Sequence, residues 1–205
     1  MQTKDSQIVY LKDYPPPKFL IDETFLQVDL LEKSALITCT LNMRRNLESL
    51  DAQSANLVLD GDYQLNTLSV KVDEVTLSTD KYRIEGNKLK VFDLPSTFSL
   101  STEVEISPYE NTRLEGVYRS GEIFCTQCEA EGFRNITWYL DRPDVMSVFT
   151  TTISAEKKYP TLLSNGNKIA SGESEHRHWA TWSDPFPKPS YLFAMVVGDL
   201  SLIHI

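Results

Sequence analysis

The chain has 205 residues, of which 41% are apolar and 24% are charged, and its formal net charge is −9. This composition is typical of a folded globular protein rather than a disordered one, and the length allows one domain with a substantial core. The acidic balance, with no Lys/Arg run longer than a pair, argues against nucleic acid and against an anionic membrane as partners.

The chain begins with MQTKDSQIVYLKDY, which lacks the apolar core of a signal peptide. No stretch of the sequence approaches the ~18 apolar residues of a membrane span. The chain has three cysteines: Cys39, Cys125 and Cys128. This number is small and odd, so it does not fit the disulfide framework of a secreted protein. We therefore expect a soluble cytoplasmic protein with reduced thiols.

Residues 1–14 are predicted to form an extended arm, and residues 15–205 a β domain. The boundary is set by Pro15-Pro16-Pro17, because proline rings remove amide donors and disfavour helix before them. Apolar side chains then alternate with polar ones, which predicts strands. The expected strands are 25–30, 34–43, 55–59, 67–72, 82–84, 88–92 and 102–106, with turns at Lys33-Ser34 and Gly86-Asn87.

The second half of the sequence continues this pattern. Turns at Ser120-Gly121 and at 165–167 predict hairpins, and apolar or β-branched runs predict strands at 147–154, 178–182 and 191–197. One helical turn is predicted at 141–144, where Pro143 suits a first helical position. The predicted fold class is all-β, a large twisted antiparallel β-sandwich or saddle.

The run Cys125-Thr126-Gln127-Cys128 has the spacing of half a zinc site or of a redox pair. A structural zinc needs four ligands, and the sequence offers only Cys39 and the three histidines (176, 178 and 204) besides. A redox pair would require a βαβ context, which the strand pattern lacks. Ordinary buried thiols are the favoured interpretation.

Three weaker patterns have similarly plain interpretations. His176 and His178 would project to one side of a strand and could hold a metal, but a histidine pair at a strand end is commoner. Asp60 and Asp62 flank Gly61 as in a calcium loop, although the remaining ligands are missing. The tryptophans at 138, 179 and 182 could line a groove that binds a sugar or peptide, but tryptophans are more often packed in the core.

Complete catalytic motifs are absent from the sequence. It contains no H-E-x-x-H, no G-x-S-x-G and no phosphate-binding glycine loop. Composition and periodicity alone therefore lead only to a β domain.

Four segments resemble the aminopeptidase N family of zinc metallopeptidases, in particular its bacterial alanyl-aminopeptidase branch. They are CTQCEAEGFR followed by ITWYLDRPDV (125–145), YPTLLSNGN (159–167), DPFPKPSYLFA (184–194) and Gly198-Asp199. The resemblance is strong over residues 112–199 and weaker back through the prolines at 15–17 to the start.

This resemblance implies an N-terminal β domain that precedes a thermolysin-like catalytic domain. The family takes its zinc ligands and general base from H-E-x-x-H and a downstream Glu, and a second substrate anchor from G-A-M-E-N. None of these occurs here. We therefore expect a fragment that binds no cofactor and is inactive alone, whereas the full-length parent would be a zinc metallo-aminopeptidase that hydrolyses peptides. The expected partners are peptide N-termini and the missing catalytic domain.

The resemblance also assigns a substrate-binding site. The family's Q-C-E-A-E glutamate, which binds the α-amino group of the substrate, maps onto Glu129, and Gln127 is a neighbouring polar contact. A carboxylate suits this task because it accepts charge-assisted hydrogen bonds from an ammonium. The alternative is that Glu129 is an ordinary solvated strand residue. Residues expected to form bracing ion pairs are Glu131, Arg134, Asp141 and Arg142.

A competing hypothesis is a stand-alone β-sandwich module that binds a peptide or glycan near Trp179 and Trp182. Because these residues lie three apart, one strand would point them to opposite sides, which weakens this hypothesis. If the domain instead lacks its partner, it should expose an apolar face and self-associate.

Overall fold

The computed structural model describes residues 10, 14–50 and 52–200. Most of the predicted arm, 1–9 and 11–13, lies outside this range. Within it, no helix is long and apolar enough to cross a membrane.

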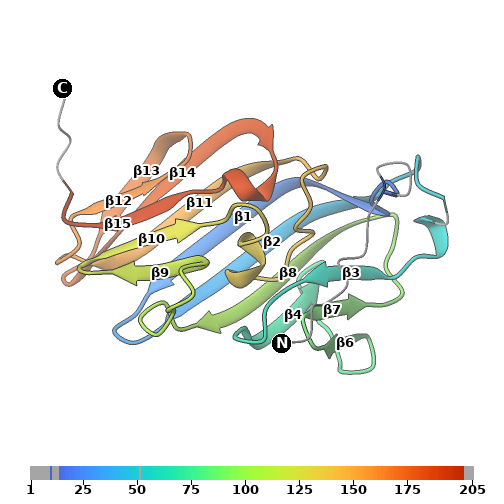
Figure 1. Cartoon of the computed structure of the whole chain (residues 1–205), viewed down its shortest axis with the longest axis horizontal. Helices are drawn as coiled ribbons and strands as arrows, with labels where there is room; N and C mark the ends of the chain where they lie inside the picture. The colour runs from blue at the N-terminus through green and yellow to red at the C-terminus, as the bar shows by residue number, and fades with distance from the viewer. Residues whose placement is uncertain (1–9, 11–13, 51, 201–205) are drawn as a thin grey trace.

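The largest layer is an eight-stranded sheet in the order β13-β14-β11-β1-β2-β8-β4-β5 (Figure 1). Its centre is the hairpin of β1 (Phe19–Leu30) and β2 (Ala35–Arg45), flanked by β8 (Thr97–Ile106) and β11 (Ser147–Glu156). The outer strands are β4 (Asn66–Val72), β5 (Val75–Thr76), β14 (Arg177–Lys188) and β13 (Asn167–Glu173). Strands β1 and β11 run parallel, and the other described pairs of this sheet are antiparallel.

Two smaller sheets lie on this layer, at different ends of it in Figure 1. The four-stranded sheet consists of β12 (Thr161–Ser164), β15 (Met195–Gly198), β10 (Ile123–Gln127) and β9 (Gly116–Ser120). The three-stranded sheet consists of β3 (Leu57–Asp60), β7 (Lys88–Val91) and β6 (Tyr82–Glu85). Short 3-10 turns occur at η2 (Ala52–Ser54), η3 (Phe133–Asn135) and η4 (Ser190–Leu192).

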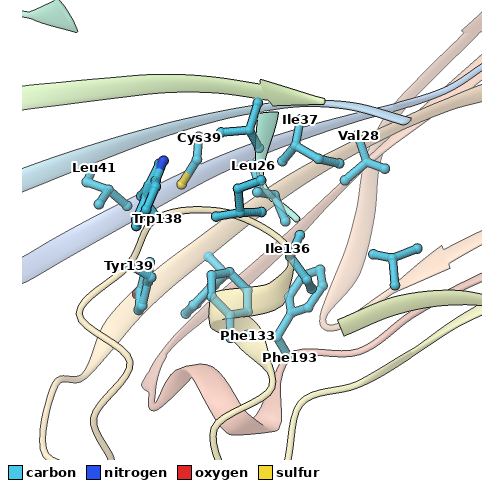
Figure 2. Close-up of a cluster of buried hydrophobic side chains, with 14 of the residues drawn as sticks. Leu26, Val28, Ile37, Cys39, Leu41, Phe133, Ile136, Trp138, Tyr139 and Phe193 are labelled. Atoms are coloured by element: carbon cyan, nitrogen blue, oxygen red, sulfur yellow. The ribbon is translucent and has the colours of Figure 1, made fainter. Parts of the chain in front are cut away.

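The core lies between the large sheet and the segment that joins β10 to β11. Alternate residues of β2 are buried, because a strand sends successive side chains to opposite faces. Figure 2 shows the two sides of this core: Leu26, Val28, Ile37, Cys39 and Leu41 from β1 and β2 meet Phe133, Ile136, Trp138, Tyr139 and Phe193. The segment after β10 is thus anchored in the core.

The all-β sandwich predicted from the sequence is confirmed. The turns at Gly86-Asn87 and Ser120-Gly121 do join antiparallel strand pairs, and Gly86 and Gly121 have positive φ angles of 56° and 59°. The turn at 165–167, however, separates β12 and β13, which pair with β15 and β14 rather than with each other.

Two local predictions were wrong. Residues 141–144 form a turn with no helical hydrogen bonding beyond Val145 N to Arg142 O at 3.3 Å. The carboxylate of Asp141 accepts hydrogen bonds from Arg134 and Ser190, so it does not cap a helix at this position. The strand predicted at 191–197 begins only at Met195, because the residues before it form η4.

Candidate functional site

Glu129 lies in the turn that connects β10 to η3. The Gly132 amide donates to the Cys128 carbonyl at 2.8 Å and closes this turn. A Cβ on Gly132 would lie 2.5 Å from the carbonyl oxygen of Gln127, so the close approach requires glycine. The turn buries Cys128 and leaves the side chains of Gln127 and Glu129 exposed.

The carboxylate of Glu129 is an accessible acceptor. Among residues 10, 14–50 and 52–200, no side chain or amide donates a hydrogen bond to it, and no cation pairs with it. The Nε2 of Gln127 donates to the backbone carbonyl of Glu129 at 3.2 Å, and the Glu129–Ala130 peptide bond is cis. The structure thus places the two residues side by side, and Glu129 lies beyond the end of the strand rather than within it.

The end of this turn is held by a buried ion pair. Arg134 donates from Nε to Asp141 Oδ2 at 3.0 Å and from its backbone amide to the same oxygen at 3.1 Å. It also contacts Glu131 at 3.3 Å. The Asp141 side chain is 1% exposed. The predicted bracing role of these three residues therefore agrees with their contacts.

Arg142 braces a different segment from the one expected. It pairs with Asp144 at 2.7 Å and donates to the Pro15 carbonyl at 2.8 Å, and its guanidinium lies over the Tyr14 ring. Its contacts therefore hold the start of the β domain rather than the Glu129 turn.

The sequence interpretation missed one member of the site. The Ser190 hydroxyl donates to Asp141 Oδ1 at 2.5 Å and is itself buried. These residues are 49 positions apart, so no spacing rule connects them. The only available signal was that both belong to segments that resemble the same family.

A groove of about 670 Å³ adjoins the turn. It runs between the segment Tyr14–Phe19, strand β3 and the segment 131–142, and its lining includes Glu131, Arg134 and the Asp60–Lys88 ion pair. Glu129 does not line it. The groove therefore lies beside the candidate anchor and not beneath it.

The burial of the three cysteines agrees with the interpretation of ordinary thiols. All three are free thiols, with Cys39 and Cys128 buried and Cys125 half-buried. Burial raises the pKa of the Cys39 thiol to about 12. Burial, and then the negative charge of Asp141, raise the pKa of the Cys128 thiol well above its usual range. Neither buried thiol has the lowered pKa of a reactive cysteine.

The histidines and aspartates of the weaker patterns have structural partners. His178 Nε2 lies 2.8 Å from the Tyr159 carbonyl, whereas His176 is exposed beside Glu175; His204 lies outside the described residues. Asp62 pairs with Arg113 at 2.9 Å. Within the described part of the chain, no three His, Cys, Asp or Glu side chains are grouped so that they could hold a metal ion. These residues therefore do not fit a zinc site.

Gly61, in the Asp60-Gly61-Asp62 run, serves packing. A Cβ there would lie 2.1 Å from the ring of Trp138, which is 1% exposed. Trp182 points inward and donates to the Leu162 carbonyl at 3.1 Å, whereas Trp179 lies on the outward face and is 39% exposed. The tryptophans therefore do not share one binding platform.

Comparison with known proteins identifies the family to which this β domain belongs. A family model described as the Peptidase M1 N-terminal domain matches residues 22–192. The chain therefore belongs to the peptidase M1 family, of which it matches the N-terminal domain.

Two bacterial relatives show how far the similarity extends. The chain is 46% identical to Aminopeptidase N of Caulobacter vibrioides over 204 residues, covering 99% of this chain and 23% of the relative. Its identity to Aminopeptidase N of Escherichia coli is also 46% over 204 residues, covering 98% of this chain and 23% of that protein. The chain thus spans about a quarter of the length of these relatives.

Solved structures agree with this assignment. Aminopeptidase A of Legionella pneumophila, determined in complex with aspartic acid, superposes with a TM-score of 0.86 at 34% identity, over 93% of this chain and 22% of that one. An M1 zinc metallopeptidase from Deinococcus radiodurans shares the fold, with a TM-score of 0.74 at 16% identity over 90% of this chain and 43% of that one.

Proposed function

We propose that this chain acts as the N-terminal domain of a zinc aminopeptidase, in which Glu129, assisted by Gln127, binds the α-amino group of a peptide substrate. The catalytic domain of the same polypeptide would supply zinc and the hydrolytic groups. The chain by itself would be inactive. The observation that carries the proposal is the exposed carboxylate of Glu129, which has no cationic partner within the described residues and stands in a run that resembles the family.

The chemistry of the turn suits an ammonium ligand. A free peptide amine has a pKa of about 7.7 to 8.0 and is largely protonated near neutral pH. A carboxylate accepts its N–H groups in charge-assisted hydrogen bonds. Because the Nε2 of Gln127 is engaged with the Glu129 carbonyl, its amide oxygen is the atom that can add a second acceptor.

An anchor of this kind explains how an exopeptidase selects the first peptide bond for cleavage. Holding the amine at a fixed point places the first peptide carbonyl at a fixed distance from it, which lowers the entropic cost of reaching the reactive geometry. The closure of the turn supports this role, since a hydrogen bond joins Gly132 to Cys128 and the loop lies between β10 and the core residue Phe133.

The test replaces the N-terminal domain of Escherichia coli Aminopeptidase N with this chain and measures kcat/KM on an alanyl substrate. The Glu129→Gln variant of this chimaera should lose about 2 to 5 kcal/mol of transition-state binding, roughly 30-fold to several thousand-fold in kcat/KM. An N-acetylated substrate should be rejected by the unaltered chimaera.

The matched control is Glu122→Gln, which removes an exposed glutamate paired with Arg119 in the turn between β9 and β10, at the other end of β10. Its kcat/KM should stay within about twofold of the unaltered chimaera, because exposed ion pairs contribute little. Unchanged kcat/KM in Glu129→Gln, or an equal loss in both variants, would refute the anchor role.

A further inference from the structure

The Glu129 turn makes few contacts of its own. Glu129, Ala130 and Glu131 are all exposed, so the direction of the Glu129 side chain depends on how the two ends of the turn are fixed. Strand β10 fixes the first end, through pairing of Gln127 with Gly116. Residues Phe133 and Arg134, which begin η3, form the second end.

The second end is held by the buried ring of Phe133 and, through Arg134, by one buried carboxylate. Asp141 Oδ2 accepts hydrogen bonds from both the backbone amide and the Nε of Arg134. The Arg134 guanidinium also donates a hydrogen bond to the backbone carbonyl of Asp141 at 3.0 Å. Three hydrogen bonds in this arrangement fix the backbone and the side chain of Arg134 together. Bidentate contacts of arginine add such geometric specificity, which a lysine point charge does not supply.

Asp141 is itself fixed from a third segment. Its other oxygen, Oδ1, accepts from Ser190 in η4, between β14 and β15. The neighbouring strand β15 meets β10 again, where the Met195 amide donates to the Thr126 hydroxyl at 2.9 Å. Asp141 therefore ties the far end of the turn to the same segment that borders its beginning.

We propose that Asp141 is a positioning residue, which acts through Arg134 to hold Glu129 in the orientation that binds the substrate amine. This inference rests on the proposed anchor role of Glu129. It adds that the anchor depends on a buried carboxylate twelve residues away that does not touch substrate. Loss of Asp141 would release Arg134 while Phe133 stays in the core, and the looser end of the turn would let the Glu129 carboxylate take several directions.

A double-mutant cycle in the chimaera tests this coupling. Glu129→Gln is measured in the unaltered background and again in Asp141→Asn, with kcat/KM on the alanyl substrate as the readout. If Asp141 acts through the anchor, the cost of Glu129→Gln should be at least tenfold smaller in the Asp141→Asn background. A purely structural role for Asp141 would lower activity by the same factor with either residue at 129, since independent sites add.

The matched control is Asp144→Asn, which removes a nearby acidic residue paired with Arg142 instead of Arg134. Its effect should be additive with Glu129→Gln. If Asp141→Asn fails to fold, Arg134→Lys replaces it in the cycle. Lysine keeps the positive charge but lacks the several planar N–H donors of the guanidinium.

The outcomes separate the two proposals. If Glu129→Gln alone has no effect, the anchor role fails and the positioning role with it. If Glu129→Gln is costly but its cost is unchanged in Asp141→Asn or Arg134→Lys, the anchor role stands and the positioning role is overturned.

Discussion

Glu129 differs from neighbouring carboxylates in what surrounds it. Asp62 and Asp144 each pair with an arginine, and Asp141 accepts from both an arginine and a serine. Such carboxylates already have their hydrogen-bonding capacity filled by the protein. The carboxylate of Glu129 has no such partner among the described residues, and an exposed acceptor is free to take a cationic ligand.

The cysteines give a prediction at the same scale. Because Cys39 and Cys128 are buried and burial raises the pKa of both thiols, neither should react with an aromatic disulfide reagent in the native protein at pH 8. Half-buried Cys125 should react first. The expected titration is one fast thiol in native buffer and three in denaturant.

This titration also tests the redox alternative for the C-x-x-C run. A disulfide between Cys125 and Cys128 would leave only one reactive thiol in denaturant, and bound zinc would protect thiols until a chelator was added. Either result would contradict the free buried thiols of the structure.

Single-residue roles were predicted from the sequence only where a local motif carried them. Glu129 and Gln127 are predicted as substrate-binding residues because they stand in a contiguous run that resembles the family. Ser190 was missed, since its hydrogen bond to Asp141 spans 49 residues and depends on tertiary packing. The need for glycine at 61 was also hidden, because it arises from the ring of Trp138, 77 residues further on.

At the scale of elements, alternation identified the strands whose two faces differ. Strand β2 alternates buried and half-exposed side chains along most of its length, and β8 and β11 do the same. Strand β13 does not, because it is an edge strand with exposed residues at six of its seven positions. An edge strand without a buried face has no period-2 signal to find.

The short connection before β11 gives a prediction about pH. The Arg142 guanidinium, by hydrogen bonding to Asp144, holds the pKa of that carboxyl below its usual range. A carboxyl whose pKa is lower in the folded state stabilises the fold above its unfolded pKa, about 3.9, and loses this effect as pH falls through the folded value. Asp144→Asn should therefore be less stable than the unaltered chain at pH 6, and the difference should shrink as pH falls from about 3.9 through the lower folded pKa of Asp144.

The expected difference at pH 6 is about 0.5 to 1 kcal/mol, because the Asp144 side chain is partly exposed and solvent screens the pair. This corresponds to a shift in Tm of about 1 to 4 °C for a chain of this size. Calorimetry at several pH values measures it. A difference that persists unchanged down to pH 2.5 would contradict the role of this ion pair.

At the scale of the whole molecule, the sandwich has a large buried core but leaves several large apolar side chains exposed. Phe186 is 76% exposed, Leu192 is 50% exposed and Met146 is 47% exposed. Phe186 lies on β14, Leu192 in η4, and Met146 directly before β11. Exposed apolar side chains that gather into one patch mark surfaces that contact another protein.

These side chains predict that the chain self-associates when it is alone. Two copies that bury Phe186 and Leu192 against each other would remove apolar surface from water, which favours association. Sedimentation velocity over a concentration series should show a dimer that dissociates on dilution. Phe186→Ser should weaken the dimer by about tenfold or more, because an exposed aromatic is the kind of residue that dominates interfaces.

Ile169→Ser is the matched control for this measurement. Ile169 is 61% exposed and lies on the edge strand β13, whereas Phe186 lies on the neighbouring strand β14, so replacing Ile169 should leave the dissociation constant unchanged if Phe186 and Leu192 form the contact. A strict monomer at high concentration would contradict the prediction. An equal effect of Ile169→Ser would instead place the contact at the sheet edge, where unpaired backbone groups of β13 can pair with a second copy.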